Sequence, residues 1–290
     1  MGARVALRKP WGLRSGSVPT TNHVRELLAA TSLPASLVDD LLEQASAVWL
    51  MGEPAEVLAG DLVLCHPPLG AEEVRATVKP TDAPGTWRLS VVAHDRPGLL
   101  AAVAGALASA GLSIVDAAAS VWPEKGLALQ RVTIVHPGGQ PLSDEDWEGI
   151  GNRLRAVVGR QEDVVPDFAP AAPVTVEAQP QEGGRVVVTV EAPDRVGLLW
   201  AVASWFESHN CNVEAYRASS EDGRATDTFV VAGEVDCAEL AASIGGVPAR
   251  AVALPAEAAR AARRIVLAAA GLGAAVALRV WRVVRRPAGP

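Results

Sequence analysis

The sequence predicts an α+β protein with two tandem ferredoxin-like βαββαβ units, a small helical region before them and a C-terminal helix after them. The first observation is a repeated phrase, Asp-Arg-x-Gly-Leu-Leu, which begins at Asp95 and again 99 residues later at Asp194. The second is that the same series of predicted strands and helices surrounds both copies. Such a series favours the split βαβ arrangement, in which helices cover one face of an antiparallel sheet.

Each phrase joins a predicted strand to a predicted helix. Alternating β-branched and polar residues predict strands over 87–93 and 186–190. Asp95 and Asp194 then occupy the position expected for a helix N-cap. Apolar residues recur at helical spacing behind the glycine of each phrase. They are Leu100, Val103 and Leu107 in the first copy, and Leu199, Val202 and Phe206 in the second.

The remaining elements follow in the same order in both units. In the first unit we predict strands over 114–121 and 127–135, a helix over 143–158 and a closing strand over 173–178. In the second unit we predict strands over 213–219 and 224–231, a helix over 236–244 and a closing strand over 249–254.

These elements divide the chain into four parts. They are a basic N-terminal tail with a small helical region (1–85), the first unit (86–178), the second unit (179–256) and an Arg-rich apolar tail (257–290). In the first part we predict helices over 24–30 and 36–50 and short helices over 54–59 and 72–77. This helical region either docks on the first unit or meets a partner.

Composition limits the classes of protein to which the chain can belong. Hydrophobic residues make up 49% of its 290 residues, which predicts packed cores. The net charge is −7, although eight arginines face one acid from Arg250 onward, so the body is acidic and nucleic acid binding is not expected. Three scattered cysteines fit a reducing compartment, and no apolar signal-peptide region follows the N-terminus. We therefore expect a cytoplasmic protein.

The C-terminal segment 265–281 leaves two interpretations open. It is apolar from Ile265 to Leu278, has arginines at both ends and carries Trp281, as a membrane anchor could. It is shorter than the roughly 20 apolar residues of a spanning helix. The alternative is a helix that packs on the body or on a second copy of the chain.

The two Asp-Arg-x-Gly turns are the strongest chemical feature. A turn at the start of a helix offers backbone N–H groups and a positive helix end to a carboxylate. Asp95 or Asp194 in the same turn can accept from an ammonium group, so the turn is complementary to a free α-amino acid. The alternative is that the two aspartates only cap their helices. The duplication favours the binding site.

The two units resemble tandem ACT domains, the small-molecule regulatory modules of amino-acid metabolism. Residues 87–254 are similar to the C-terminal ACT pair of the bacterial bifunctional uridylyltransferase/uridylyl-removing enzymes that act on the nitrogen regulator PII. The segments that carry the resemblance are 95–100, 113–117, 173–176 and 194–199. The resemblance implies an amino-acid sensor without a cofactor, with glutamine as the usual ligand.

The resemblance also implies which residues surround a ligand. They are Asp95, Arg96, Gly98 and Leu99 in the first turn, Asp194, Arg195, Gly197 and Leu198 in the second, and Ile114 and Val213 near the bound side chain. Pro97 of the first turn is replaced by Val196 in the second, and Trp200 and Glu214 have no like residue in the first unit. The two sites are therefore not expected to be equivalent.

The sequence lacks the catalytic parts of that enzyme family. It has no Gly-Ser turn followed by paired acids for nucleotidyl transfer. The pair His94-Asp95 resembles part of a metal phosphohydrolase motif, but the five histidines show no metal-binding arrangement, so His94 is expected to end a strand. We expect no metal and no catalytic residue.

The function that these observations favour is a non-catalytic amino-acid sensor in amino-acid or nitrogen metabolism. The units are expected to pair within the chain or between chains, because each alone leaves open sheet edges. A homodimer or a regulated protein partner would fit that expectation. Two alternatives stay open: a truncated or divergent PII uridylyltransferase-type enzyme, and a ligand-free interaction scaffold with or without a membrane tether.

Overall fold

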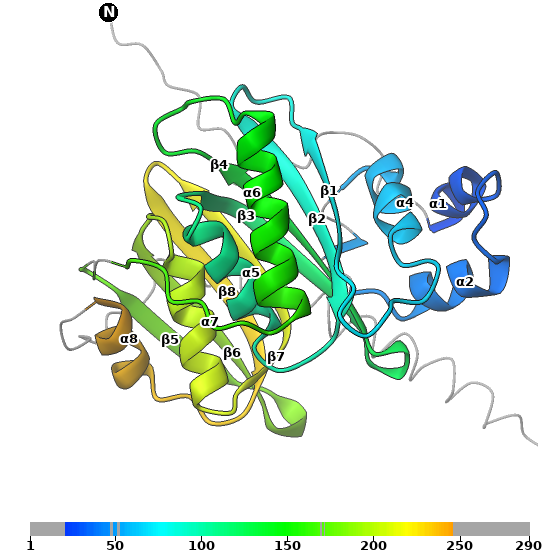
Figure 1. Ribbon diagram of the computed structural model, residues 1–290. Coiled ribbons are helices and arrows are strands. Elements are labelled where there is room, and N and C mark those ends of the chain that lie inside the picture. Colours follow the sequence, from blue (N-terminus) through cyan, green and yellow to red (C-terminus); the bar gives the residue numbers. More distant parts are fainter. Residues whose placement is uncertain (1–20, 47–48, 51–52, 169, 171, 246–290) are drawn as a thin grey trace, which may run out of the picture.

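The computed structural model describes residues 21–46, 49–50, 53–168, 170 and 172–245 (Figure 1). Its centre is one eight-stranded sheet in the order β1-β2-β4-β3-β7-β8-β6-β5, in which neighbouring strands are antiparallel. Two ferredoxin-like units, each with two helices on the same face, form this sheet side by side. The predicted fold class is confirmed.

The four strands and two α-helices of each unit correspond one to one, whereas the short 3-10 and π-helical turns do not. The first unit contains β1 (Arg75–Pro80), β2 (Thr86–His94), α5 (Leu99–Ala108), β3 (Ser113–Trp122), a 3-10 turn η1 (Pro123–Lys125), β4 (Leu127–Val135), α6 (Asp144–Leu154) and a π-helical turn η2 (Arg155–Gly159). The second contains β5 (Thr175–Pro180), a 3-10 turn η3 (Glu182–Gly184), β6 (Arg185–Pro193), α7 (Leu198–Ser208), β7 (Asn212–Glu221), β8 (Arg224–Ala232) and α8 (Cys237–Gly245).

The outer strand of each unit comes from the segment that precedes the unit. β1 pairs with β2, and β5 pairs with β6. The strand predicted over 173–178 therefore exists, but the prediction that it closes the first unit was wrong. A strand directly upstream needs only a short hairpin to supply the second neighbour that the backbone of β2 or β6 requires. The strand predicted over 249–254 lies outside the described residues, and the domain bounds stay a prediction.

The segment 72–77 was predicted as a short helix, and this was wrong because β1 begins at Arg75. Pairing with β2 decides its conformation, since Arg75 lies opposite Val92 and Pro80 opposite Trp87.

The two units meet through β3 and β7 at the middle of the sheet. Three residue pairs join these strands, Asp116 with Ser219, Ala117 with Ala218, and Ala118 with Arg217. Asp116 and Arg217 also form an ion pair across the joint. The units therefore pair within one chain, which is one of the two arrangements that the sequence left open, the other being pairing between chains.

Helix α5 is buried along its whole length. The apolar face expected from Leu100, Val103 and Leu107 is present, but all ten residues of the helix are buried because α6 and α7 flank it on the same face of the sheet (Figure 1). Gly105 permits this close packing. A Cβ at that position would lie 2.7 Å from Val164 Cγ1 and 2.8 Å from Trp200 Cδ1.

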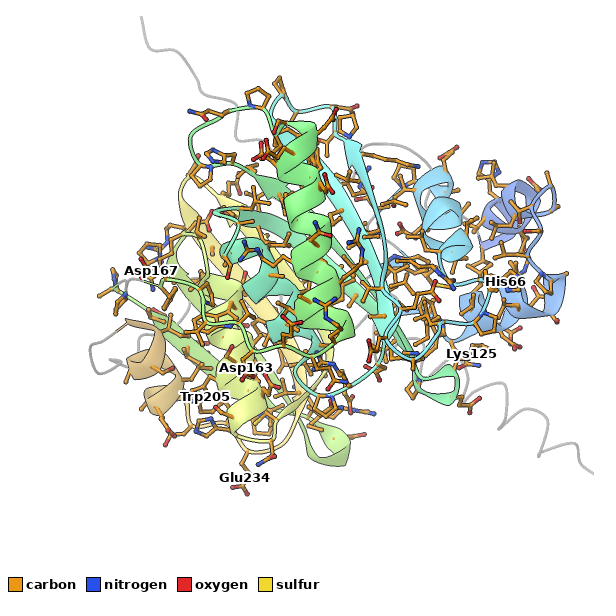
Figure 2. The ribbon with its side chains drawn as sticks, viewed as in Figure 1. His66, Lys125, Asp163, Asp167, Trp205 and Glu234 are labelled. Carbon is orange, nitrogen blue, oxygen red and sulfur yellow. The ribbon has the colours of Figure 1, made fainter. Side chains whose placement is uncertain are left out.

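The N-terminal helices cover the opposite face of the first unit. They are α1 (Thr21–Leu28), α2 (Ala35–Glu43) and α4 (Ala55–Val63). Their apolar side chains pack on Val92, Trp122 and Leu129 of the sheet. Trp122 Nε1–H donates to the carbonyl of Leu41 at 2.8 Å. Lys125, which Figure 2 shows close to these helices, has its Nζ 3.0 Å from Asp40 Oδ2. The helical region thus docks on the first unit, one of the two arrangements left open.

A buried ionic cluster lies beneath α4. The Asp61 carboxylate accepts from Ser90 Oγ at 2.5 Å and from Trp49 Nε1 at 3.2 Å. Arg131 of β4 lies beside it, 3.5 Å from Glu53 Oε1 and 3.9 Å from Asp61 Oδ2. Burial raises the pKa of Asp61 and lowers that of Arg131. The cluster holds the helical layer to the sheet through charge as well as apolar contact.

None of the helices in the described part of the chain is long and apolar enough to cross a membrane. The segment 265–281 lies outside that part, so both interpretations of it stay predictions.

Candidate functional site

The two repeated phrases form the same turn. Asp95 N–H donates to the carbonyl of Gly126, and Asp194 N–H donates to that of Gly223, at 3.0 and 2.8 Å. Leu99 N–H then donates back to Arg96 C=O at 3.3 Å, and the second unit repeats this bond from Leu198 to Arg195. These bonds place both aspartates at the end of a strand, immediately before the turn.

The glycine of each turn has a left-handed conformation. Gly98 has φ 75° and ψ 0°, and Gly197 has φ 87° and ψ −2°, the values of the third residue of a type II turn. These glycines are the N-cap residues of α5 and α7, and no side chain caps either helix. The expectation that Asp95 and Asp194 cap these helices was therefore wrong. Their carboxylates are not used as caps.

Each turn faces the other unit. The turn at Asp95 opens onto a cavity whose far wall includes Val213, and the turn at Asp194 faces Ile114. The predicted residues thus divide into two sets. Val213 of the second unit lies with the first turn, and Ile114 of the first unit lies with the second turn. Each site therefore contains residues of both units, because β3 and β7 are adjacent.

The cavity at the first turn has a volume of about 170 Å³. The turn, the start of α5, the end of α7 and the strands β3, β4 and β7 line it. The N–H groups of Leu100 and Ala101 lie in the first turn of α5, where a helix offers no acceptor to them. The carboxylate of Glu207, from α7, lies against Gly98 so closely that a Cβ there would collide with it. Residues with free first-turn N–H groups and residues with carboxylates therefore line the same cavity.

The site at the second turn is closed. Its volume is about 10 Å³, the lower limit for one water molecule. Phe168 packs on the glycine of this turn, because a Cβ on Gly197 would lie 3.1 Å from its ring and the Arg195 guanidinium stacks on the ring at 4.3 Å. Trp200 contacts the same ring edge-on at 6.2 Å. The expected difference between the two turns is visible as one open and one closed site.

The two arginines of the turns hold neighbouring elements. Arg96 donates to the carbonyl of Val157 in η2 at 3.4 Å, and Arg195 donates to that of Ile244 in α8 at 3.0 Å. Both guanidinium groups thus bind backbone of the second helical segment of their own unit.

The acids of the two sites differ in their surroundings. Partial burial raises the pKa of Asp95, and the backbone N–H of Arg96 opposes this. Asp194 accepts a hydrogen bond from the Ser220 hydroxyl. Burial and the nearby Asp194 carboxylate raise the pKa of Asp227 to about 8, so Asp227 is mostly protonated at pH 7.

Sequence reasoning missed several residues that line the two sites. Gln130 and Tyr216 line the open cavity, Asp227 lines the closed one, and Phe168 packs on its glycine. Gln130 and Asp227 could have been found by aligning β4 with β8, the third strands of the two repeats. Gln130 pairs with Val91 and Asp227 pairs with Val190, and these two valines occupy the same position of the repeat. Phe168 lies in the segment that connects η2 to β5, outside the predicted elements of the repeat.

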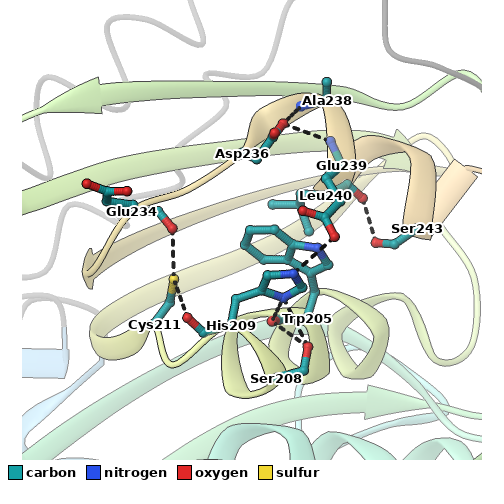
Figure 3. Close-up of polar contacts among 10 residues, drawn as sticks. All are labelled: Trp205, Ser208, His209, Cys211, Glu234, Asp236, Ala238, Glu239, Leu240 and Ser243. Carbon is teal, nitrogen blue, oxygen red and sulfur yellow. Dashed lines mark hydrogen bonds and ion pairs between the residues drawn. The ribbon is translucent and has the colours of Figure 1, made fainter.

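A third hollow, of about 580 Å³, lies where α7 ends and α8 begins (Figure 3). His209 stacks on Trp205 at 3.9 Å, and its Nε2 lies 3.1 Å from Glu239 Oε1. The Trp205 carbonyl and this carboxylate raise the pKa of His209. Asp236 caps α8 through the N–H groups of Ala238 and Glu239. These contacts join two helices, and none of the predicted site residues lies among them.

Histidine, cysteine and carboxylate side chains form no metal-binding group of three or more in the part of the chain that the structure describes. His94 is the last residue of β2, as expected, and its Nε2 lies 2.9 Å from the Gly70 carbonyl oxygen.

Comparison with known proteins identifies part of the chain. Residues 87–144 match the ACT domain family. Bifunctional uridylyltransferase/uridylyl-removing enzymes match over a longer stretch. The one from Burkholderia lata is 24% identical over 71% of this chain and 25% of its own length, and the one from Nitrobacter hamburgensis is 30% identical over 64% and 21%. The chain spans about a quarter of the length of the curated relatives it matches.

Two solved structures are also similar, at low overall superposition. Aspartate kinase from Synechocystis has a TM-score of 0.34 and 16% identity, over 51% of this chain and 24% of that chain. A putative glycine cleavage system transcriptional repressor has a TM-score of 0.21 and 16% identity, over 52% and 82%. From the family match and the fold together, the chain carries an ACT domain within the first of two ferredoxin-like units and resembles the ACT region of uridylyltransferase/uridylyl-removing enzymes.

Proposed function

We propose that the chain is a non-catalytic regulatory protein that binds a free amino acid in the cavity between its two units. The ACT match supports a regulatory ligand-binding role. The observation that carries the finer proposal is the open cavity at the Asp95 turn, where first-turn N–H groups of α5 and carboxylates from both units face one space.

A zwitterion is complementary to this arrangement. The N–H groups of Leu100 and Ala101, at the positive end of α5, suit the α-carboxylate of the ligand. The carboxylates of Asp95 and Glu207 suit its ammonium group. Glutamine is the ligand that the resemblance favours, in amino-acid or nitrogen metabolism, and the free thiols of Cys65, Cys211 and Cys237 support a cytoplasmic protein.

Binding at this place would regulate by changing how the units dock. The ligand would contact the first turn and β7 at once, so its affinity depends on their relative position. A ligand shifts an equilibrium only by its difference in affinity for the two arrangements. The partner that reads this change is a regulated protein or a second copy of the chain.

The test is a thermal-shift panel of the twenty amino acids on the full chain. We expect at least one amino acid to raise the melting temperature in a dose-dependent way. At a ligand concentration of one hundred times Kd, binding should add about 2.7 kcal/mol to the free energy of unfolding. Asp95→Ala should abolish the shift. Asp194→Ala is the matched control and should keep it, because the second site is closed. A shift from no amino acid, or one lost only with Asp194→Ala, would contradict the proposal.

A further inference from the structure

The sheet of the second unit has one face that none of the described helices covers. Helices α7 and α8 cover its other face, where the paired residues Val188 and Phe229 belong to the apolar core. The next pair along the same strands is Thr189 with Thr228, so both threonines point to the opposite face. The N-terminal helices lie beside β1 and β2 in Figure 1, at the other end of the sheet from β5.

The threonines of this face are nonetheless almost inaccessible. Thr189 is 4% exposed and Thr228 is 6% exposed. The equivalent pair of the first unit, Ser90 with Arg131, is buried to a similar degree, at 3% and 2%. In the first unit the cover is α4, since Ser90 Oγ donates to the Asp61 carboxylate of that helix. The similar burial indicates a similar cover over the second unit.

The described elements do not explain this burial. Val187, on the same face, is 2% exposed although it belongs to neither of the two apolar clusters that the described residues form. The structure contains a single chain, so no second copy of the chain is responsible. The long segments outside the described residues are 1–20 and 246–290.

We propose that the apolar C-terminal segment 265–281 docks on this face of the second unit, as the N-terminal helices dock on the first. The segment follows α8, which ends at Gly245 and packs on β5, the edge strand of the second unit. The connecting residues 246–264 reach about 60 Å when extended, which is enough to pass around β5. This inference goes beyond the proposed function and does not depend on it.

The composition of the segment suits the face. Val187 and Val230 form a pair on it, and the carboxylates of Glu177 and Glu191 belong to the same face. The run from Ile265 to Leu278 is apolar and has arginines at both ends, so it can offer apolar contact to the valines and positive charge to the acids. As a helix the run would be about 21 Å long, and four strands are about 14 Å across. Residues 1–20 contain no apolar run of this length.

The face is also continuous with the one that the N-terminal helices cover. Thr228 pairs with Arg217, Arg217 with Ala118, and Ala118 with Arg131. This row of residues therefore runs from the second unit across the joint to the buried ionic cluster beneath α4. A segment docked on the second unit would extend the N-terminal helical layer across the sheet.

The test is labelling of cysteines with iodoacetamide in the full chain, read at each position by mass spectrometry. Thr228→Cys should react at least ten-fold more slowly than Thr77→Cys, which lies on the same face of the sheet but is exposed. Adding Leu272→Asp, which places a charge in the middle of the segment, should speed the reaction at position 228 at least ten-fold. Leu13→Asp, in the N-terminal tail, is the matched control and should not. Cys65, buried beneath the N-terminal helices, should stay slow throughout, since faster reaction there would report general unfolding.

Cross-linking gives a second measurement that adds no charge to the segment. With a short bis-maleimide, Thr228→Cys combined with Leu272→Cys should give a cross-link within one chain, and Thr228→Cys combined with Leu13→Cys should not. Fast labelling at position 228 without a second substitution would overturn the proposal, because the face would then be open to a membrane or to another chain. Release by Leu13→Asp in place of Leu272→Asp would also overturn it. If Leu272→Asp exposes Cys65 as well, the cross-link decides, and its absence overturns the docking.

Discussion

Single residues distinguish the two copies of the site. The turns are nearly identical in bonds and in the dihedral angles of Gly98 and Gly197. The residues around them differ, since Gln130 occupies the position of Asp227, and Phe168 packs on Gly197 where Glu207 lies against Gly98. The buried Asp227, at the position of Gln130, should make the stability of the protein depend on pH.

Asp227→Asn should stabilise the protein increasingly as pH rises. The pKa of Asp227 is raised to about 8 in the folded chain, while the unfolded chain ionises near pH 4. Between these values the folded state binds the extra proton, so stability falls as pH rises. We expect the asparagine variant to remove this loss, with almost no gain at pH 4 and a gain of up to about 5 kcal/mol at pH 8.

Urea unfolding at intervals from pH 4 to pH 9 measures this difference. Glu221→Gln, at an exposed position on the same hairpin, is the control and should change stability by less than about 0.5 kcal/mol. A gain for Asp227→Asn that does not depend on pH would contradict the assignment of the proton to this carboxyl group.

Whole elements depend on partners that are distant in sequence. β1 and β5 are strands because β2 and β6 would otherwise have a neighbouring strand on one side only. β1 and β5 are therefore the two edge strands of the sheet. The N-terminal helices are held by Trp122 and by the ionic cluster around Arg131. The docking of these helices therefore involves a buried ionic cluster and a more exposed ion pair between Lys125 and Asp40.

Asp61→Ala should cost far more stability than Asp40→Ala. Loss of Asp61 leaves the buried Arg131 without one of its two carboxylate neighbours, and breaking a buried pair in this way costs about 3–5 kcal/mol. Asp40 and Lys125 are partly exposed, so the control should cost about 1 kcal/mol or less. Chemical denaturation of the full chain measures both, and equal losses would contradict a role for buried charge.

At the scale of the whole molecule, the joint between β3 and β7 creates the site. It makes one sheet of two units, places Val213 across from the first turn and Ile114 across from the second, and leaves one of the two sites open. A ligand in the open cavity would therefore be held by both units.

Saturating glutamine should slow hydrogen exchange in both units at once. We expect protection at the start of α5 and in β7, because both line the cavity, and little change at the start of α7, where the site is closed. Mass spectrometry of the full chain with and without ligand measures this. Protection confined to one unit would contradict binding between the units.

Much of the fold follows from local pattern. The period-two strands and the amphipathic helices behind each phrase depend on neighbouring residues, and both were predicted correctly. The candidate turns were also identified in this way, since backbone donors at a helix start depend on the turn itself.

By itself, then, the sequence determined the two ferredoxin-like units and the turns at Asp95 and Asp194. Only the tertiary structure decided which strand completes each unit, which turn faces an open cavity and that Gln130 and Tyr216 line that cavity. The physical reason is that strand pairing and cavity shape depend on residues far apart in the chain. No local spacing can show that Phe168 packs on Gly197 while Glu207 lies against Gly98.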